Sequence, residues 1–328
     1  MTKLYIFNII AIFYIFIIIK IKDDNHNDFN DSISKNYQQK IKDFQYKNFS
    51  ILRRLECPGC GFFSFFVVNL GCIKKFLSTG YIPIVDLQSF PNVYNKWNLS
   101  NINPWEFFFH QPFNYSLEEV LKYAKNIQYF ECTSKTERPN EIHIYYNKTS
   151  INYWHSFTKK YVPLKEELLN EAKGIMKEIF GRTKNILGVK MRGTDYISKK
   201  PRGHSIPPKI EQVITDVKIM DKKYQYDFIF FATEDEILKK KFIPQFKDKL
   251  KLLNPKNKIQ CINTDKCTKN SNKDKNENIE YIKNYVLNII ILSRCLDLVT
   301  ARCNGAVGIF ILSEGFRNVK IYNNGIYS

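Results

Sequence analysis

An arginine, Arg192, ends an apolar stretch in the sequence GVKMRGTDY (residues 188–196) and is followed by the polar turn Gly-Thr-Asp. A guanidinium group presents a planar fork of donors that suits two-point contact with a phosphate. Gly193 lets backbone N–H groups approach a ligand, and Thr194 and Asp195 can close the turn or hold a sugar hydroxyl. An equally good interpretation is structural, with Asp195 capping a local helix and Arg192 pairing with a carboxylate. The turn indicates phosphate binding without requiring it.

Two further polar turns follow apolar stretches. TEDE comes after FIFFA and supplies Thr233 and Asp235, whose oxygens suit contacts with a ribose or a base. Acidic turns of this kind are more often solvated helix starts. ARCNGAVG comes after LDLVT, and Asn304 and Gly305 open the next expected helix, where unpaired backbone N–H groups can bind an anion. Close packing of this helix on the sheet is the alternative role for Gly305, and the two roles are compatible.

The elements that would carry these turns alternate between strand and helix from residue 184 onward. We expect strands at 186–192, 227–233 and 296–301, and helices at 165–180, 208–220, 235–249 and 281–294. This alternation predicts an α/β fold with a parallel, doubly wound sheet. Ligands of such sheets bind beyond the carboxyl ends of the strands. The three turns are therefore expected to line one cleft.

The first half of the chain contains a Cys/Gly-rich turn, CPGCG, ahead of a helix expected at 62–80 and a strand at 81–87. With Gly59 and Gly61 it resembles a phosphate-cradling turn, but it lacks the Lys and Ser/Thr of a P-loop, and no GxGxxG sequence occurs. His204, in PRGHSIPP, is expected in a loop beside the same cleft and ahead of a helix start. His and acidic residues do not cluster as metal ligands, so no metal is expected.

The amino-terminal segment is apolar from Leu4 to Ile19 except for Asn8, and lysines flank it on both sides. It is slightly short of the roughly 20 residues that span a bilayer and has no small-x-small cleavage site. We therefore expect an uncleaved signal-anchor at 1–21, followed by a polar stalk at 22–50, in a single-pass type II membrane protein. The catalytic part would face a secretory lumen, or the cell envelope in a bacterium.

The eight cysteines fit an oxidising compartment. Cys57 with Cys60, and Cys261 with Cys267, are spaced closely enough for local disulfides, while the pairing as a whole stays open. A zinc site is less favoured because only one CxxC sequence occurs and no histidine pair accompanies it.

The net charge of +18 permits nucleic acid, an anionic membrane surface or a phosphorylated ligand as partner. The lysines are dispersed along the chain, with no zinc-finger spacing, RNP motif or basic heptad. We therefore expect no nucleic-acid partner, and much of the charge is expected to be a solvated surface.

Together the motifs resemble the α1,6-fucosyltransferase family and its superfamily with the protein O-fucosyltransferases and α1,2-fucosyltransferases, over roughly residues 55–325. The segments that carry the resemblance, in the family's order and spacing, are CPGCGFFSFFVVNLGCI, LGVKMRGTDY with GHSIPP, FIFFATEDE and YVLNIIILSRCLDLVTARCNGAVG. The resemblance implies a GT-B architecture of two Rossmann-like domains, GDP-fucose as donor, inversion at the anomeric carbon, a glycan acceptor and no metal.

Transferred residue by residue, the resemblance implies that Arg192 grips the β-phosphate. Thr194 and Asp195 match the Thr-Asp beside it, and Gly59 and Gly61 match the turn at the diphosphate. The predicted catalytic residues are Arg192 and Asp195. The predicted donor-binding residues are Gly59, Gly61, Lys190, Gly193, Thr194, His204, Thr233, Asp235, Asn304 and Gly305.

The sequence also departs from the family pattern. Lys190 replaces a histidine, Gly193 a second arginine and Tyr196 a lysine, and Asn288 stands where an aspartate is expected. The glutamate that follows in the α1,6 enzymes has no match, so the general base is unassigned. Asp195 is one candidate for it, and Glu106, in NPWEF, is a weaker one.

The sequence thus predicts an amino-terminal, acceptor-side domain at 51–180 and a nucleotide-sugar domain at 181–328, behind the anchor and the stalk. The predicted function is that of a membrane-anchored glycosyltransferase, in the first place a fucosyltransferase. Two alternatives use the same cleft: a transferase with another nucleotide sugar, and an inactive glycan-binding relative.

Overall fold

The computed structural model describes residues 39, 41–42, 44–94, 102–139, 147–193, 195–253 and 275–328, without the side chains of Asp195 and 275–279. The chain forms two compact units, Met1–Phe49 with Glu118–Ile127, and Ser50–Leu117 with Gln128–Ser328. In the first unit the ring of Phe44 packs against Phe49 and Tyr123, with centroids 5.8 and 5.9 Å away. Apart from most of α3 (Leu117–Tyr123) and the first two residues of β1 (Asn48–Arg53) and of β3 (Asn126–Glu131), the residues discussed below belong to the second unit.

The second unit contains a five-stranded sheet in the order β6-β5-β4-β7-β8, and every neighbouring pair is parallel. The strands are β4 (Ile186–Lys190), β5 (Phe228–Ala232), β6 (Leu250–Lys251), β7 (Asp297–Ala301) and β8 (Asn318–Tyr322). Every residue of β4 and β7 is buried, as expected for central strands with helices on both faces. The prediction of an α/β fold with a parallel sheet is confirmed.

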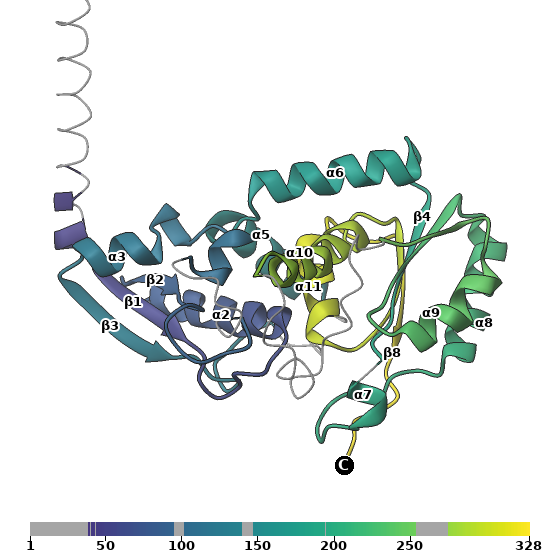
Figure 1. Cartoon of the computed structure of the whole chain (residues 1–328), viewed down its shortest axis with the longest axis horizontal. Helices are drawn as coiled ribbons and strands as arrows, with labels where there is room; N and C mark the ends of the chain where they lie inside the picture. The colour runs from purple at the N-terminus through teal and green to yellow at the C-terminus, as the bar shows by residue number, and fades with distance from the viewer. Residues whose placement is uncertain are drawn as a thin grey trace, which may run out of the picture. The chain divides into compact units, whose positions relative to one another are not determined.

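Alternate residues of the strands enter two separate cores. Leu187 and Val189 pack in a cluster with α8 (Ile210–Tyr224) and α9 (Glu236–Phe242). Ile186, on the other face, packs in a cluster with α10 (Lys275–Leu292), α11 (Asn304–Leu312) and α6 (Glu166–Phe180). Figure 1 shows the two helix layers on opposite sides of the sheet. Because helices cover both faces of the sheet, successive side chains of each strand point alternately into one core and the other.

The amino-terminal part of this unit has a second sheet, in the order β2-β1-β3, with strands β1 (Asn48–Arg53), β2 (Ile82–Val85) and β3 (Asn126–Glu131). Helix α2 (Phe62–Leu77) packs beside it, and a disulfide joins Cys72 of α2 to Cys132 after β3. Helix α2 also contacts α11, where a side chain at Gly308 would collide with the ring of Phe63. The two sheets therefore share one aromatic core.

Most predicted elements are present with shifted ends. The helix expected at 62–80 ends at Leu77, and β1 begins at Asn48, before Ile51, where the sequence predicts the onset of order. The aromatic stretch 91–116 contains two short 3-10 helices, η2 (Pro104–Phe107) and η3 (Pro112–Asn114), ahead of α3 (Leu117–Tyr123). Strands β1 and β3 and helix α5 (Lys148–Tyr161) were not predicted.

The anchor predicted at 1–21, most of the stalk, Thr194 and the Cys261–Cys267 bridge lie outside the described residues. Among the described helices, none combines the length and the apolar character that crossing a bilayer requires. The division into domains at residues 50 and 180 stays a prediction.

Candidate active site at the carboxyl edge of the parallel sheet

Strands β4, β5 and β7 end at the same edge of the sheet, because Lys190 lies in register with Ala232 on one side and Thr300 on the other. Lys190 is the last residue of β4 and is only 3% exposed. Arg192 follows two residues later, and Glu234 follows β5 in the turn before α9. The sheet thus brings two cations and one carboxylate to one place.

The carboxylate of Glu234 faces Arg192 across a gap. Its Oε1 lies 3.7 Å from Nη1 of Arg192, which is within ion-pair distance but longer than a hydrogen bond. This Oε1 is buried and accepts no hydrogen bond in the described part of the chain. Burial alone would raise the pKa of Glu234, but the charges of Lys190 and Arg192 outweigh it and lower that pKa. The glutamate is therefore ionised and held mainly by charge.

Three tyrosines lie near these charges; Tyr94 is buried and the other two are half-buried. Tyr281 and Tyr285 come from α10, and the Nζ of Lys190 lies 5.4 Å from the ring centroid of Tyr285. Burial, and after it the charge of Glu234, raises the pKa of both hydroxyls, so they stay protonated donors. The third, Tyr94, has its pKa raised by burial and by Tyr285, while Arg192 acts in the opposite direction. Tyr94 is therefore close enough for the charge of Arg192 to act on it.

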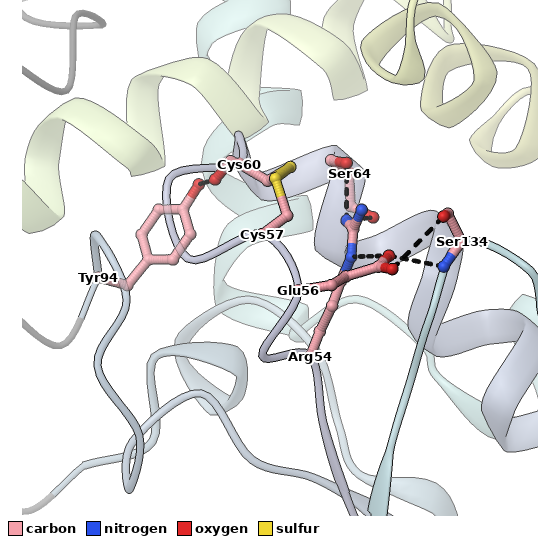
Figure 2. Close-up of a disulfide and its surroundings, with 7 residues drawn as sticks. All are labelled: Arg54, Glu56, Cys57, Cys60, Ser64, Tyr94 and Ser134. Carbon is pink, nitrogen blue, oxygen red and sulfur yellow. Dashed lines mark hydrogen bonds and ion pairs between the residues drawn. A yellow bond between two sulfur atoms is a disulfide. The ribbon is translucent and has the colours of Figure 1, made fainter.

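Tyr94 also links the Cys/Gly-rich turn to this edge. Its hydroxyl donates to the carbonyl oxygen of Cys60 at 3.2 Å. Cys60 forms the expected disulfide with Cys57, and its N–H donates to the Cys57 carbonyl at 3.1 Å. Figure 2 shows Tyr94 beside the disulfide. The turn with Gly59 and Gly61 is thus connected to this edge through Tyr94, and its contact with a diphosphate stays a prediction.

Hydrogen bonds on the side of the turn away from Tyr94 hold the segment that leads into the turn (Figure 2). The Nη1 of the buried Arg54 donates to the carbonyl and the hydroxyl of Ser64, at 2.9 and 2.8 Å. Glu56 accepts from the Nε of Arg54 at 3.4 Å and from the backbone N–H of Ser134 at 2.6 Å. These contacts join β1, the first turn of α2 and the segment after β3. Among the described residues other than its two chain neighbours, none comes within 4 Å of where a side chain at Gly61 would begin.

Gly193 and Asp235 fit against one another. A side chain at Gly193 would begin 2.6 Å from the Cβ of Asp235 and closer still to its Oδ2. Asp235 is only 8% exposed, and its Oδ1 caps α9 by accepting from the N–H groups of Ile237 and Leu238 at 2.8 and 3.2 Å. The packed aspartate explains why glycine, and no second arginine, follows Arg192. A donor contact of Asp235 stays a prediction, as does one of Thr233, whose Oγ1 accepts from the Asp235 N–H at 3.2 Å.

The start of α11 packs directly on Lys190 and Tyr285. A side chain at Gly305 would begin 2.6 Å from the hydroxyl of Tyr285 and 3.0 Å from the Cε of Lys190. The close-packing role of this glycine is therefore present. Asn304 opens the helix, and the Sγ of Cys303 accepts from the N–H of Ala306 at 3.4 Å.

His204 lies near Arg192 through a shared neighbour. The guanidinium of Arg192 stands 4.5 Å from the ring centroid of Tyr196, and the ring of His204 meets Tyr196 edge-on at 5.3 Å. Backbone hydrogen bonds with Tyr327 fix this loop, since the Gly203 N–H donates at 2.8 Å and the His204 carbonyl accepts at 2.9 Å. His204 is exposed, which leaves its ring accessible to a ligand.

The remaining predicted residues have different outcomes. Thr194 lies outside the described residues, and Asp195 opens α7 (Asp195–Ser198) with its side chain undescribed, so its role as base stays a prediction. The Oε1 of Glu106 accepts from Gln111 and from the Leu117 N–H, both at 2.9 Å, which indicates a structural role. Within the described ranges, no group of three or more His, Cys, Asp or Glu side chains could hold a metal ion.

Sequence reasoning missed Glu234 and all three tyrosines. Tyr281 and Tyr285 are four residues apart in an expected helix, a spacing that places both on one face. That signal was available. Tyr94 offered none, because only the folded chain brings it to the cations.

The sequence matches no protein-family model and no curated protein. Among solved structures, POFUT1 in complex with GDP is 9% identical, with a TM-score of 0.50 over 84% of this chain and 99% of that one. The chain has the fold of POFUT1. NodZ α-1,6-fucosyltransferase soaked with GDP-fucose is 13% identical, with a TM-score of 0.48 over 81% of this chain and 93% of that one. A fucosyltransferase NodZ from Bradyrhizobium is 12% identical, with a TM-score of 0.47 over 82% and 93%.

Proposed function

We propose that this chain is a fucosyltransferase that transfers fucose from GDP-fucose to a glycan with inversion and without a metal ion. The observation that carries the proposal is the pair of cations, the buried Lys190 and the partly exposed Arg192, at the carboxyl edge of the parallel sheet. POFUT1, whose fold this chain shares, was crystallised with GDP. In this proposal the chain is a GT-B enzyme, and its donor lies at this edge.

Transfer of fucose from GDP requires positive charge beside the diphosphate, and these cations supply it. When the anomeric carbon leaves GDP, negative charge grows on the β-phosphate, and fixed cations and N–H dipoles stabilise it. Arg192 would contribute a two-point contact and Lys190 a compact charge. The start of α11, with Asn304 and Gly305, would add backbone N–H groups.

Glu234 gives Arg192 a temporary partner. A largely desolvated guanidinium needs a counter-charge before the donor arrives, since an uncompensated charge away from water is costly. At 3.7 Å the pair lacks the hydrogen bond that would make the exchange for a phosphate expensive. Arg192 can therefore be held in place in the empty site and still be released to the diphosphate.

We also propose that the protein is a type II membrane protein of a secretory lumen. The apolar run from Leu4 to Ile19 supports the anchor. Two disulfides, Cys57–Cys60 and Cys72–Cys132, support an oxidising compartment.

The proposal is tested by incubating the full chain, purified in a non-ionic detergent with EDTA, with GDP-fucose or with UDP-sugars and a mixture of glycans. We expect fucosylated product from GDP-fucose only, and at least tenfold less from Arg192→Lys, because a lysine cannot make the two-point contact. Transfer from a UDP-sugar alone would assign a different donor. No transfer, combined with glycan binding, would favour the inactive relative.

A further inference from the structure

A second cationic site lies away from the sheet edge, in a hollow of about 540 Å³ beside the carboxyl-terminal half of α2. We call it the lysine hollow. Its lining residues come from α2, β3 and the segment that follows β3; those used below are Lys74, Lys75, Phe130, Thr133, Lys135 and Thr136. A volume in this range suits one or two sugar residues.

The lysine hollow has more positive than negative charge. Three lysines line it, against a single carboxylate, Glu137. Lys74 uses that carboxylate, with its Nζ 2.5 Å from Oε1. Within the described chain, Lys75 and Lys135 have no carboxylate partner. Two ammonium groups are thus available to an anion.

Aromatic rings hold two of the three lysines, Lys74 and Lys75, at the hollow. The Nζ of Lys75 stands 4.4 Å from the ring centroid of Phe130, and that of Lys74 stands 5.3 Å from the ring of Tyr153. Such cation–π contacts restrict a side chain while leaving its N–H donors exposed. Thr133 and Thr136 add hydroxyls to the same wall. Ammonium groups interleaved with hydroxyls suit a sugar that bears acidic groups.

The two walls are tied together next to the lysines. The Cys72–Cys132 disulfide joins α2 to the end of β3. One residue earlier, Gly71 lets the two segments approach so closely that a side chain there would begin 2.9 Å from the Cβ of Arg138. The hollow is therefore held open by the fold and is preformed for a ligand.

From this arrangement we propose that the lysine hollow binds an anionic saccharide, with carboxylate or sulfate groups on the sugar. The small volume excludes a nucleic-acid duplex, and the hydroxyls favour a sugar over a simple ion. Binding here requires no donor, so the proposal stands whether or not the sheet edge transfers fucose. If it does, the hollow would select acidic glycans.

The test is calorimetric titration of the full chain in detergent with a sulfated, uronic-acid-containing disaccharide, and with lactose as the neutral probe. We expect the Lys75→Gln/Lys135→Gln variant to bind the sulfated disaccharide at least tenfold more weakly, and lactose not to bind. The control is Lys222→Gln/Lys223→Gln on α8, which removes the same charge and also includes a lysine resting on an aromatic ring, Tyr224.

Equal affinity in the Lys75→Gln/Lys135→Gln variant would overturn the proposal. So would an equal loss in the control, since that would assign the effect to net charge. Lys75 and Lys135 are exposed, so folding should be preserved. The single variant Lys135→Glu, which changes no packed side chain, should weaken binding in the same direction.

Discussion

The two edges of the parallel sheet each place a carboxylate beside an arginine, and they do so differently. At the amino edge, Asp297 accepts from Nη2 and Nε of Arg317 at 2.7 and 3.2 Å, from the Asn318 N–H at 2.8 Å, and from the hydroxyl of Tyr226. At the carboxyl edge, Glu234 meets Arg192 at 3.7 Å and its Oε1 accepts no hydrogen bond from the described residues.

The difference in hydrogen bonding indicates a structural role for Asp297 and a role in ligand binding for the edge that carries Glu234. A carboxylate whose oxygens are all satisfied holds strands together, because exchanging any partner would cost a hydrogen bond. A carboxylate held mainly by charge leaves its arginine able to change partners. The amino edge is therefore a fixed joint, and the carboxyl edge is prepared for an anionic ligand.

The largest effect that the comparison predicts is on stability. Asp297→Asn removes the charge from several hydrogen bonds and should lower the free energy of unfolding by about 2–3 kcal/mol. GDP affinity should stay unchanged, because the substitution lies at the opposite edge. Urea unfolding and a GDP titration of the same sample check both statements. A loss of GDP affinity in the folded variant would contradict the assignment of a purely structural role to the amino edge.

A smaller effect is expected from Glu234→Gln. Removing this negative charge should tighten binding of inorganic pyrophosphate about tenfold, or about 1.4 kcal/mol, because the probe no longer competes with a carboxylate for Arg192. Asp235→Asn is the matched control, since it changes the adjacent charge in the same turn. Weaker pyrophosphate binding in Glu234→Gln would mean that the glutamate positions Arg192 more than it competes for it.

The smallest expected effect is on the loss of folding stability at acid pH. Burial alone would raise the pKa of Asp297, but hydrogen bonds from Arg317, Tyr226 and Asn318 outweigh it and lower that pKa. The resulting stability is fully present above the unfolded-state value of about 3.9 and is lost as the pH falls through the folded-state value. Between about pH 5 and pH 3 the wild type should lose more stability than Asp297→Asn. Parallel curves for the two proteins would exclude this contribution.

The sequence predicts the carboxyl edge well because the determinants are local. Apolar runs locate β4, β5 and β7, and parallel pairing then gathers the residues that follow each strand. The sequence cannot tell two adjacent carboxylates apart, however. Asp235 caps α9 while Glu234 faces the cations, and this choice depends on where the chain leaves β5.

The residues that the amino-terminal part of the chain adds to the site were harder to predict, because their contacts join residues far apart in sequence. Tyr94 reaches the cations, and Cys72 pairs with Cys132, only once α2 has packed against β1 and α11. Strand β3 was missed because it is largely exposed and has no run of buried apolar residues. The hydrophobic pattern of a short stretch of sequence does not reveal contacts between distant residues or a strand that is largely exposed.

The most direct test of the central claim, that Arg192 holds a nucleoside diphosphate, is a calorimetric titration of the full chain with GDP and with UDP. The variants are Arg192→Ala and, as the matched arginine of the other edge, Arg317→Ala. We predict that the wild type and folded Arg317→Ala bind GDP equally well and in preference to UDP. Arg192→Ala should bind GDP at least about 30-fold more weakly, or about 2 kcal/mol, with its fold intact. Wild-type affinity for GDP in a folded Arg192→Ala protein would contradict the account.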